Sequence, residues 1–259
     1  MLELSHIESF YPENLRHFKR NILREYLQYK ILAVIFGGKY AAKLVFMGGT
    51  AIHVAHGMAR FSEDLDFDNL GLSRNDFRGL AQSAARQLTL EGFKVDTGVS
   101  FQAAYSADIK ITGVLFELGL SGHREEKILI KIDSEAQEFK YAPQRIILNK
   151  FDVMAAISVV PVDILLSQKF FAILKRRRAV GRDFYDAMFL AGKTKPNFTY
   201  LKAKAGIGGM ESLKEALEQR CKGLNFKQLA RDTAALVFVP GEAQKIALFS
   251  EFIENLQGG

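Results

Sequence analysis

The hydrophobic periodicity of this chain changes near residue 160, and this change limits the folds that are open to it. Between residues 44 and 133, short apolar runs and alternating patterns typical of strands are separated by glycines. From about Pro161 onward, apolar residues recur at helical spacing as far as the C-terminus. The sequence therefore predicts an α+β fold, with a mixed sheet in a first domain at 1–155 and a helical domain at 156–259.

The same patterns predict the individual elements. In the first domain we expect helices over 13–36, 50–55 and 73–90, and strands over 44–47, 60–68, 94–100, 108–118 and 127–133. Ser73 is the predicted N-cap of its helix, because Asp76 lies three residues later, as in a capping box. In the second domain we expect helices over 162–178, 182–191, 211–221, 226–237 and 242–256.

Composition excludes several classes of protein. No stretch approaches the roughly 18 uninterrupted apolar residues of a membrane span, so we expect no membrane association. The first residues lack the basic and apolar regions of a secretory signal, and the single cysteine, Cys221, cannot form a disulfide within the chain. Both features favour a cytoplasmic protein. The net charge of +6 gives weak support for a polyanionic partner such as RNA.

The segment from Leu44 to Asp68, LVFMGGTAIHVAHGMARFSEDLDFD, carries the most informative chemistry. A predicted strand ends at the sequence Gly-Gly-Thr, where a helix begins. Glycine N–H groups can approach a bulky anion there, and the helix N-terminus adds positive potential. Asp64 and Asp66 lie two residues apart on the next predicted strand, so both carboxylates project from one face. Such a pair suits Mg²⁺, which prefers oxygen ligands and substrate phosphates.

Plainer interpretations stand beside this one. A glycine pair alone is usually a turn, and a D-x-D pattern alone is usually a solvated strand face. Their combination in one segment is more specific, because it is a geometry for holding a metal-bound triphosphate. His53 and His56 lie three residues apart in the same segment, but no third ligand follows, so packing or surface roles are favoured over a metal site.

Two blocks of the sequence resemble the AbiEii/AbiGii family of nucleotidyltransferase toxins, within the DNA-polymerase-β-like superfamily. The first block is GGTA followed by RFSEDLDF, and the second contains Lys169 to Ala172 and Arg182 to Asp186, similar to the family's K-x-x-A and RD-x-x-D motifs. The resemblance implies a polymerase-β-like domain followed by a helical domain. It also implies an NTP substrate and Mg²⁺ or Mn²⁺ as the cofactor.

The resemblance also implies roles for individual residues. The expected nucleotide-binding residues are Gly48, Gly49, Thr50, Ser62 and Lys169. The expected catalytic residues are Asp64, Asp66, Lys169 and Asp183. Lysine suits the phosphate-binding role because its ammonium is a compact point charge that can neutralise phosphate oxygens, and Asp183 could orient it.

Members of the superfamily usually add a third metal-binding carboxylate from a neighbouring strand. In the predicted strand ILIKIDSE, isoleucines alternate with polar residues, and Asp133 lies on the polar side. We expect Asp133 to bind metal together with Asp64 and Asp66. Glu135 and Asp108 remain competitors for this role.

The implied function is the transfer of a nucleotide from an NTP to an acceptor hydroxyl by the toxin of a toxin–antitoxin or phage-defence system. In some relatives the acceptor is tRNA, and the basic run from Lys175 to Arg178 could serve such an acceptor. The implied partner is a cognate antitoxin, an AbiEi-like winged-helix protein. Two alternatives stay open: a nucleotidyltransferase that modifies a small molecule or a protein, and a nucleotide-binding or partner-binding module without turnover.

Overall fold

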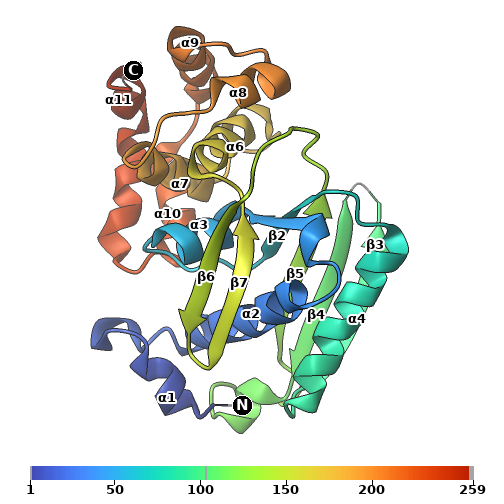
Figure 1. The fold of residues 1–259 in the computed structure, drawn as a ribbon. Helices are drawn as coiled ribbons and strands as arrows, with labels where there is room; N and C mark the ends of the chain where they lie inside the picture. The colour runs from blue at the N-terminus through green and yellow to red at the C-terminus, as the bar shows by residue number, and fades with distance from the viewer. Residues whose placement is uncertain (1, 103, 257–259) are drawn as a thin grey trace. The chain divides into compact units, whose positions relative to one another are not determined.

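The structure is a computed structural model that describes residues 2–102 and 104–256. The chain divides into two compact units (Figure 1). Unit 1 comprises Met1–Ala55, Phe61–Glu138 and Pro143–Val159. Unit 2 comprises His56–Arg60, Phe139–Ala142 and Val160–Gly259. Among the helices that the structure describes, none combines the length and apolar character needed to cross a membrane.

Unit 1 is built on a seven-stranded mixed sheet with the strand order β3-β4-β5-β2-β1-β7-β6. The strands are β1 (Leu44–Met47), β2 (Leu65–Asn69), β3 (Lys94–Phe101), β4 (Tyr105–Thr112), β5 (Lys127–Glu135), β6 (Gln144–Lys150) and β7 (Val153–Val159). Near the middle of the sheet, β2 pairs antiparallel with β1 and parallel with β5. The fold is a mixed α+β architecture, as predicted.

Two long helices of unit 1, α2 (Lys19–Gly37) and α4 (Arg74–Leu90), contact each other and pack against the sheet (Figure 1). Helix α2 packs on β7, and α4 packs on β3 and β4. The predicted capping box at the start of α4 is confirmed, because the Ser73 hydroxyl accepts a hydrogen bond from the Asp76 N–H at 3.1 Å. The short elements of this unit are α1 (Leu4–Ser9), η1 (Glu13–Leu15), η2 (Ala41–Lys43), α3 (Gly48–His56, whose last residue belongs to unit 2) and α5 (Val114–Glu117).

Strands β4 and β5 have one apolar and one polar face. On β5, Ile130 and Ile132 are fully buried, whereas Lys131 and Asp133 between and beside them are partly exposed. The same alternation on β4 buries Ile109. Because side chains alternate along a strand, the polar residues of both strands gather on one side of the sheet. This polar side carries the candidate site.

Unit 2 is helical in its main part. Its elements are α6 (Val162–Lys175), α7 (Gly181–Ala191), α8 (Phe198–Ala205), α9 (Met210–Cys221), α10 (Phe226–Ala234), η3 (Pro240–Leu248) and α11 (Phe249–Glu254). Helix α7 contacts α6 and α10. At Gly181, an added Cβ would lie 2.2 Å from the Leu229 carbonyl oxygen, so α7 begins in close contact with the backbone of α10. Phe184 and Phe249 pack edge to face in the core, with ring centroids 4.8 Å apart.

Several predicted boundaries were wrong. The strand expected at 60–68 begins only at Leu65, because hydrogen bonds to other elements hold the backbone of residues 62–64. The strand expected at 108–118 ends at Thr112, because Gly113 adopts a left-handed conformation (φ 84°) and α5 follows. The helix expected at 242–256 is divided into η3 and α11, and the one expected at 13–36 into η1 and α2. The β6–β7 hairpin and α8 were not predicted.

Candidate functional site

Gly48 stands where β1 ends and α3 begins. Its backbone is left-handed, with φ 78°, and an added Cβ would lie 2.1 Å from Asp66 Oδ2. Both the conformation and the contact require glycine at this position. The first residue of α3 and the Asp66 carboxylate are therefore in direct contact, as expected for two parts of one site.

Asp66 and Asp133 are register partners on the neighbouring parallel strands β2 and β5. Residues paired in this way project from the same face of a sheet. Asp133 Oδ2 lies 3.1 Å from Lys131 Nζ. Asp133 Oδ1 is buried and has no hydrogen-bond partner among residues 2–102 and 104–256. The structure thus brings together two carboxylates that the sequence predicted as metal ligands, and one of their oxygens is available to a ligand.

A cavity of about 480 Å³ opens on this polar face of unit 1. Its charged and hydroxyl-bearing lining residues include Asp66, Ser106, Asp108, Lys131, Asp133 and Glu135. Asp108 lies one strand further from β2 than Asp133, on β4, where its carboxylate is 3.3 Å from Lys110 Nζ. Of the three candidates for the third carboxylate, Asp133 is therefore the one that stands directly beside Asp66.

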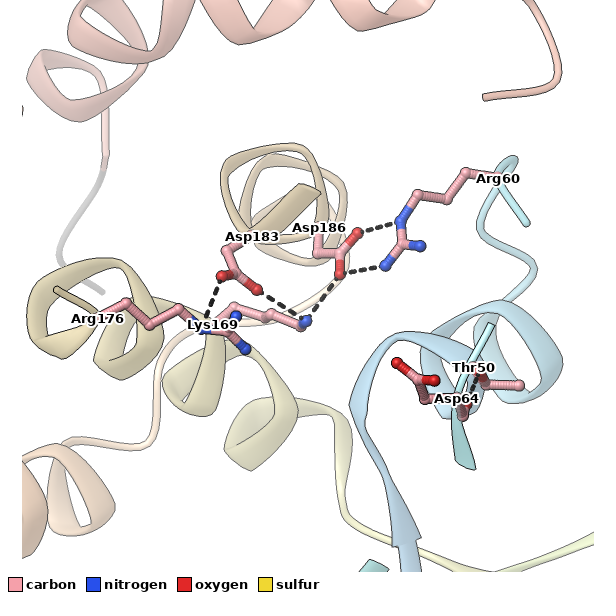
Figure 2. A network of polar contacts seen from close by, with 7 residues as sticks. All are labelled: Thr50, Arg60, Asp64, Lys169, Arg176, Asp183 and Asp186. Atoms are coloured by element: carbon pink, nitrogen blue, oxygen red, sulfur yellow. Dashed lines mark hydrogen bonds and ion pairs between the residues drawn. The ribbon is translucent and has the colours of Figure 1, made fainter. Parts of the chain in front are cut away.

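Asp64 lies just before β2, outside the set of described residues that line the cavity. The buried Thr50 hydroxyl donates a hydrogen bond of 2.5 Å to the main-chain carbonyl oxygen of Asp64 (Figure 2). A hydrogen bond to Asp133, together with the charges of Asp133, Asp64 and Asp108, raises the pKa of Lys131 above its ordinary value. Asp64 and Asp133 therefore act electrostatically on the same ammonium group.

The loop that precedes Asp64 is held by α2. The Gln28 side-chain amide donates to the carbonyl oxygens of Ser62 and Glu63, at 3.0 and 2.9 Å. Gln28 is buried, and its amide group is satisfied by these two carbonyl oxygens, so the two hydrogen bonds hold the loop against α2. Sequence reasoning missed Gln28, although a glutamine on the same helix face as the buried Ile31 and Leu32 was a usable signal. The nucleotide-binding role of Ser62 stays a prediction.

His53, on α3, belongs to a buried ionic cluster. Its Nε2 lies 3.0 Å from Glu25 Oε2, and Lys150 Nζ lies 2.7 Å from Glu25 Oε1. Burial alone would raise the pKa of Glu25, but His53 and Lys150 outweigh it and lower this pKa to about 2. This cluster fastens α3 to α2 and β6, in agreement with the packing role favoured for His53.

A second ionic network lies within unit 2. Lys169 Nζ lies 2.9 Å from Asp186 Oδ2 and 3.2 Å from Asp183 Oδ1 (Figure 2). Asp186 also accepts two hydrogen bonds of 2.7 Å from the fully buried Arg60 guanidinium, and Arg176 Nε lies 3.2 Å from Asp183 Oδ2. Burial would lower the pKa of Lys169, but the negative charges of Asp186 and Asp183 outweigh it and raise this pKa. Lys169 is therefore held as an ammonium.

Sequence reasoning named Lys169 and Asp183 as site residues and quoted Asp186 only as part of a motif. Arg60 was likewise quoted only as the first residue of the motif RFSEDLDF and was given no role. The structure shows that Asp186 contacts both buried cations, and that Lys169 and Asp183 are close together. Burial would raise the pKa of Asp186, but Arg60 and Lys169 outweigh it and lower this pKa. The phosphate contact predicted for Lys169 stays a prediction.

The residues of unit 1 fit a divalent cation. Within the described part of the chain, no three His, Cys, Asp or Glu side chains are gathered closely enough to form a ready metal cluster. Mg²⁺, however, is usually bound by one or two carboxylates together with substrate phosphates and water. Asp66 and Asp133 supply such a pair, and the unpartnered Oδ1 of Asp133 is a donor atom of the right chemistry.

Comparison with solved structures places the fold. The chain resembles a protein from H. pylori described as a candidate nucleotidyltransferase, with a TM-score of 0.57 and 17% identity, over 90% of this chain and 94% of that one. An antigenic nucleotidyltransferase-like protein from Paracoccidioides brasiliensis gives a TM-score of 0.42 and 16% identity, over 81% of this chain and 93% of that one. No curated protein matches the chain.

The glycine turn at the N-terminus of α3 contacts Asp66, which is the register partner of Asp133, and the family model that matches the chain places it in the class of nucleotidyltransferases. The family model described as "Nucleotidyl transferase AbiEii toxin, Type IV TA system" matches residues 30–254. The chain belongs to this family, and the membership implies an NTP substrate and an antitoxin partner.

Proposed function

We propose that this toxin transfers a nucleotide from an NTP to an acceptor hydroxyl, with Mg²⁺ or Mn²⁺ held by Asp64, Asp66 and Asp133. The observation that carries the proposal is the position of Asp66, whose carboxylate contacts Gly48 and stands beside Asp133. A triphosphate at the start of α3 would lie next to this carboxylate pair. When bound, the cation would neutralise phosphate charge and favour ionisation of the attacking hydroxyl.

The main-chain N–H groups of Gly48 and Gly49, at the N-terminus of α3, are suited to hold the triphosphate. Thr50 acts through its hydrogen bond to the Asp64 carbonyl, which keeps the aspartate backbone in place. We assign the phosphate-binding role to Lys169 and its orientation to Asp183, because ion pairs fix this ammonium in its charged form. Positioning and charge neutralisation would then account for most of the catalysis.

We further propose that the acceptor is RNA, with tRNA as the leading candidate, and that the protein acts in the cytoplasm in phage defence. The net charge of +6 supports an anionic acceptor. The run from Lys175 to Arg178 is exposed, and of its residues Arg176 is paired with Asp183. The proposed partner is a winged-helix antitoxin.

The test is to incubate the full-length protein with each labelled NTP, Mg²⁺ or Mn²⁺, and total RNA, protein or small-molecule extracts. We expect label in the tRNA fraction, and its loss in Asp64→Ala and Asp66→Ala. Asp96→Ala is the matched control, since Asp96 is an exposed aspartate on β3. Growth assays of the same variants report on toxicity.

Each part of the proposal can fail separately. Label found only in the protein or small-molecule fraction would contradict the RNA acceptor and leave nucleotide transfer intact. Full toxicity in both aspartate variants would leave only explanations based on binding. Equal transfer with and without divalent cations would contradict the metal-dependent mechanism.

A further inference from the structure

We propose that Lys131 is an internal counter-ion of the metal site, whose ammonium contacts Asp133 and competes with a divalent cation for this carboxylate. The inference rests on the proposed function, because it takes Asp66 and Asp133 to be metal ligands. It assigns a role to a residue that neither the motifs nor the predicted site contained.

The geometry places Lys131 on the carboxylate that a cation would need. Lys131 and Asp133 are two residues apart on β5 and project from the same face, and Lys131 Nζ lies 3.1 Å from Asp133 Oδ2. The other oxygen, Oδ1, is buried and has no hydrogen-bond partner in the described part of the chain. The ammonium therefore occupies one oxygen and leaves the other, so the carboxylate is only partly satisfied.

The charges around the cavity explain why a counter-ion is needed. Asp66, Asp108, Asp133 and Glu135 line it, and Lys131 is the one cationic residue among its described lining residues. Carboxylates on neighbouring strands repel each other, and an ammonium beside them reduces that repulsion. A bound divalent cation would reduce the same repulsion with twice the charge.

The ammonium and a divalent cation compete for Asp133. Oxygen ligands approach Mg²⁺ to about 2.1 Å, so a cation on Asp133 Oδ2 would lie within a few ångströms of the ammonium and repel it. The Lys131 side chain is 43% exposed and has a flexible stem, so it can move aside without disturbing the core. Metal binding to this oxygen must therefore displace the ammonium, and a cation on Oδ1 would still be repelled by it.

A matched control lies on the adjacent strand. Lys110 and Asp108 on β4 are also two residues apart, with Nζ 3.3 Å from Oδ2, and their side chains are 40% and 37% exposed. Removing Lys110 deletes a positive charge from the same face of the sheet without exposing Asp133. A general loss of positive charge can thus be separated from the release of one carboxylate.

The experiment measures Mn²⁺ affinity of the full-length protein at low salt, from the electron paramagnetic resonance signal of free Mn²⁺. We expect Lys131→Met to tighten Mn²⁺ binding about fivefold, and Lys110→Met to change it by less than about twofold. Lys131→Arg should bind Mn²⁺ like the wild type, because its charge remains. Thermal unfolding of each variant checks that the fold is intact.

Unchanged or weaker binding in Lys131→Met would overturn the inference. Equal tightening in Lys110→Met would also overturn it, because the effect would then be general electrostatics. Asp133→Asn separates this failure from that of the proposed function. If Asp133→Asn loses Mn²⁺ while Lys131→Met is unchanged, only the counter-ion role fails. If neither the wild type nor Lys131→Met binds Mn²⁺, the metal-dependent function fails as well.

Discussion

Asp66 Oδ2 lies where a side chain on Gly48 would have to be, 2.1 Å from the position of an added Cβ. The carboxylate and the first residue of α3 are therefore placed together, and Gly48 cannot gain a side chain while Asp66 keeps its position. Because Gly48 also has a φ of 78°, any other residue there would be strained as well as obstructed.

Gly48→Ala should reduce nucleotide transfer by about 100-fold, because displacement of a reacting group by about 1 Å costs that much. The free energy of unfolding should fall by about 1–3 kcal/mol from backbone strain. Gly92→Ala is the control, since Gly92 has a φ of 95° but no atom within 4 Å of an added Cβ. If both variants lost activity equally, the contact with Asp66 would not be the cause.

Asp133→Asn should abolish transfer, with a loss of at least about 100-fold, because one ligand of the proposed cation is removed. Asp108→Asn should retain activity to within about tenfold, since Asp108 lies a strand further from Asp66 and is paired with Lys110. Steady-state rates at saturating Mn²⁺ would compare the two. The reverse order of the losses would make Asp108 the third metal-binding carboxylate.

Asp186→Ala should lower the free energy of unfolding by about 3–5 kcal/mol, because it leaves the buried Arg60 guanidinium without its partner. Lys169 would keep its ion pair with Asp183. Glu242→Gln breaks a much more exposed pair with Lys245 and should cost less than about 1 kcal/mol. Urea unfolding followed by circular dichroism measures both. An unchanged midpoint in Asp186→Ala would show that the Arg60–Asp186 pair contributes little stability.

Glu25 should make the protein sensitive to acid. Its pKa is lowered in the folded state from 4.5 to about 2, so its contribution is fully present above pH 4.5 and is lost as the pH falls towards 2. The contribution is of order 3 kcal/mol for this buried group. Unfolding free energies of the wild type and Glu25→Gln between pH 6 and about pH 3 test this. The wild-type curve should fall more steeply, and parallel curves would count against the role of Glu25.

The parts of the fold that could be predicted are those whose signals lie close together in the sequence. The capping box needs only Ser73 and Asp76, and the strand Leu44–Met47 is bounded by its own glycines. The alternation in β5 was enough to place Asp133 on the polar face, and it also places Lys131 there. The pairing of these two residues could have been predicted from the same pattern.

The rest depends on partners that are far apart in the chain. Arg60 and Asp186 are separated by 126 positions, and Gln28 contacts carbonyl groups more than 30 positions away. A local pattern does not record such pairs, because any charged or amide side chain can find a partner only once the fold is formed. The β6–β7 hairpin was missed for a related reason, since its exposed Ile147 and Met154 blur the alternation that marks a strand.

The short stretch 56–60, which begins with the last residue of α3, belongs to unit 2, where Arg60 is paired with Asp186, although the residues on both sides of it belong to unit 1. No single cut in the polypeptide therefore separates the two units. During synthesis on the ribosome, the Arg60 guanidinium, in the segment between α3 and Asp64, can be paired only after Asp186 has been made. A fragment that ends near residue 155 would therefore contain Arg60 without Asp186, its partner in the ion pair.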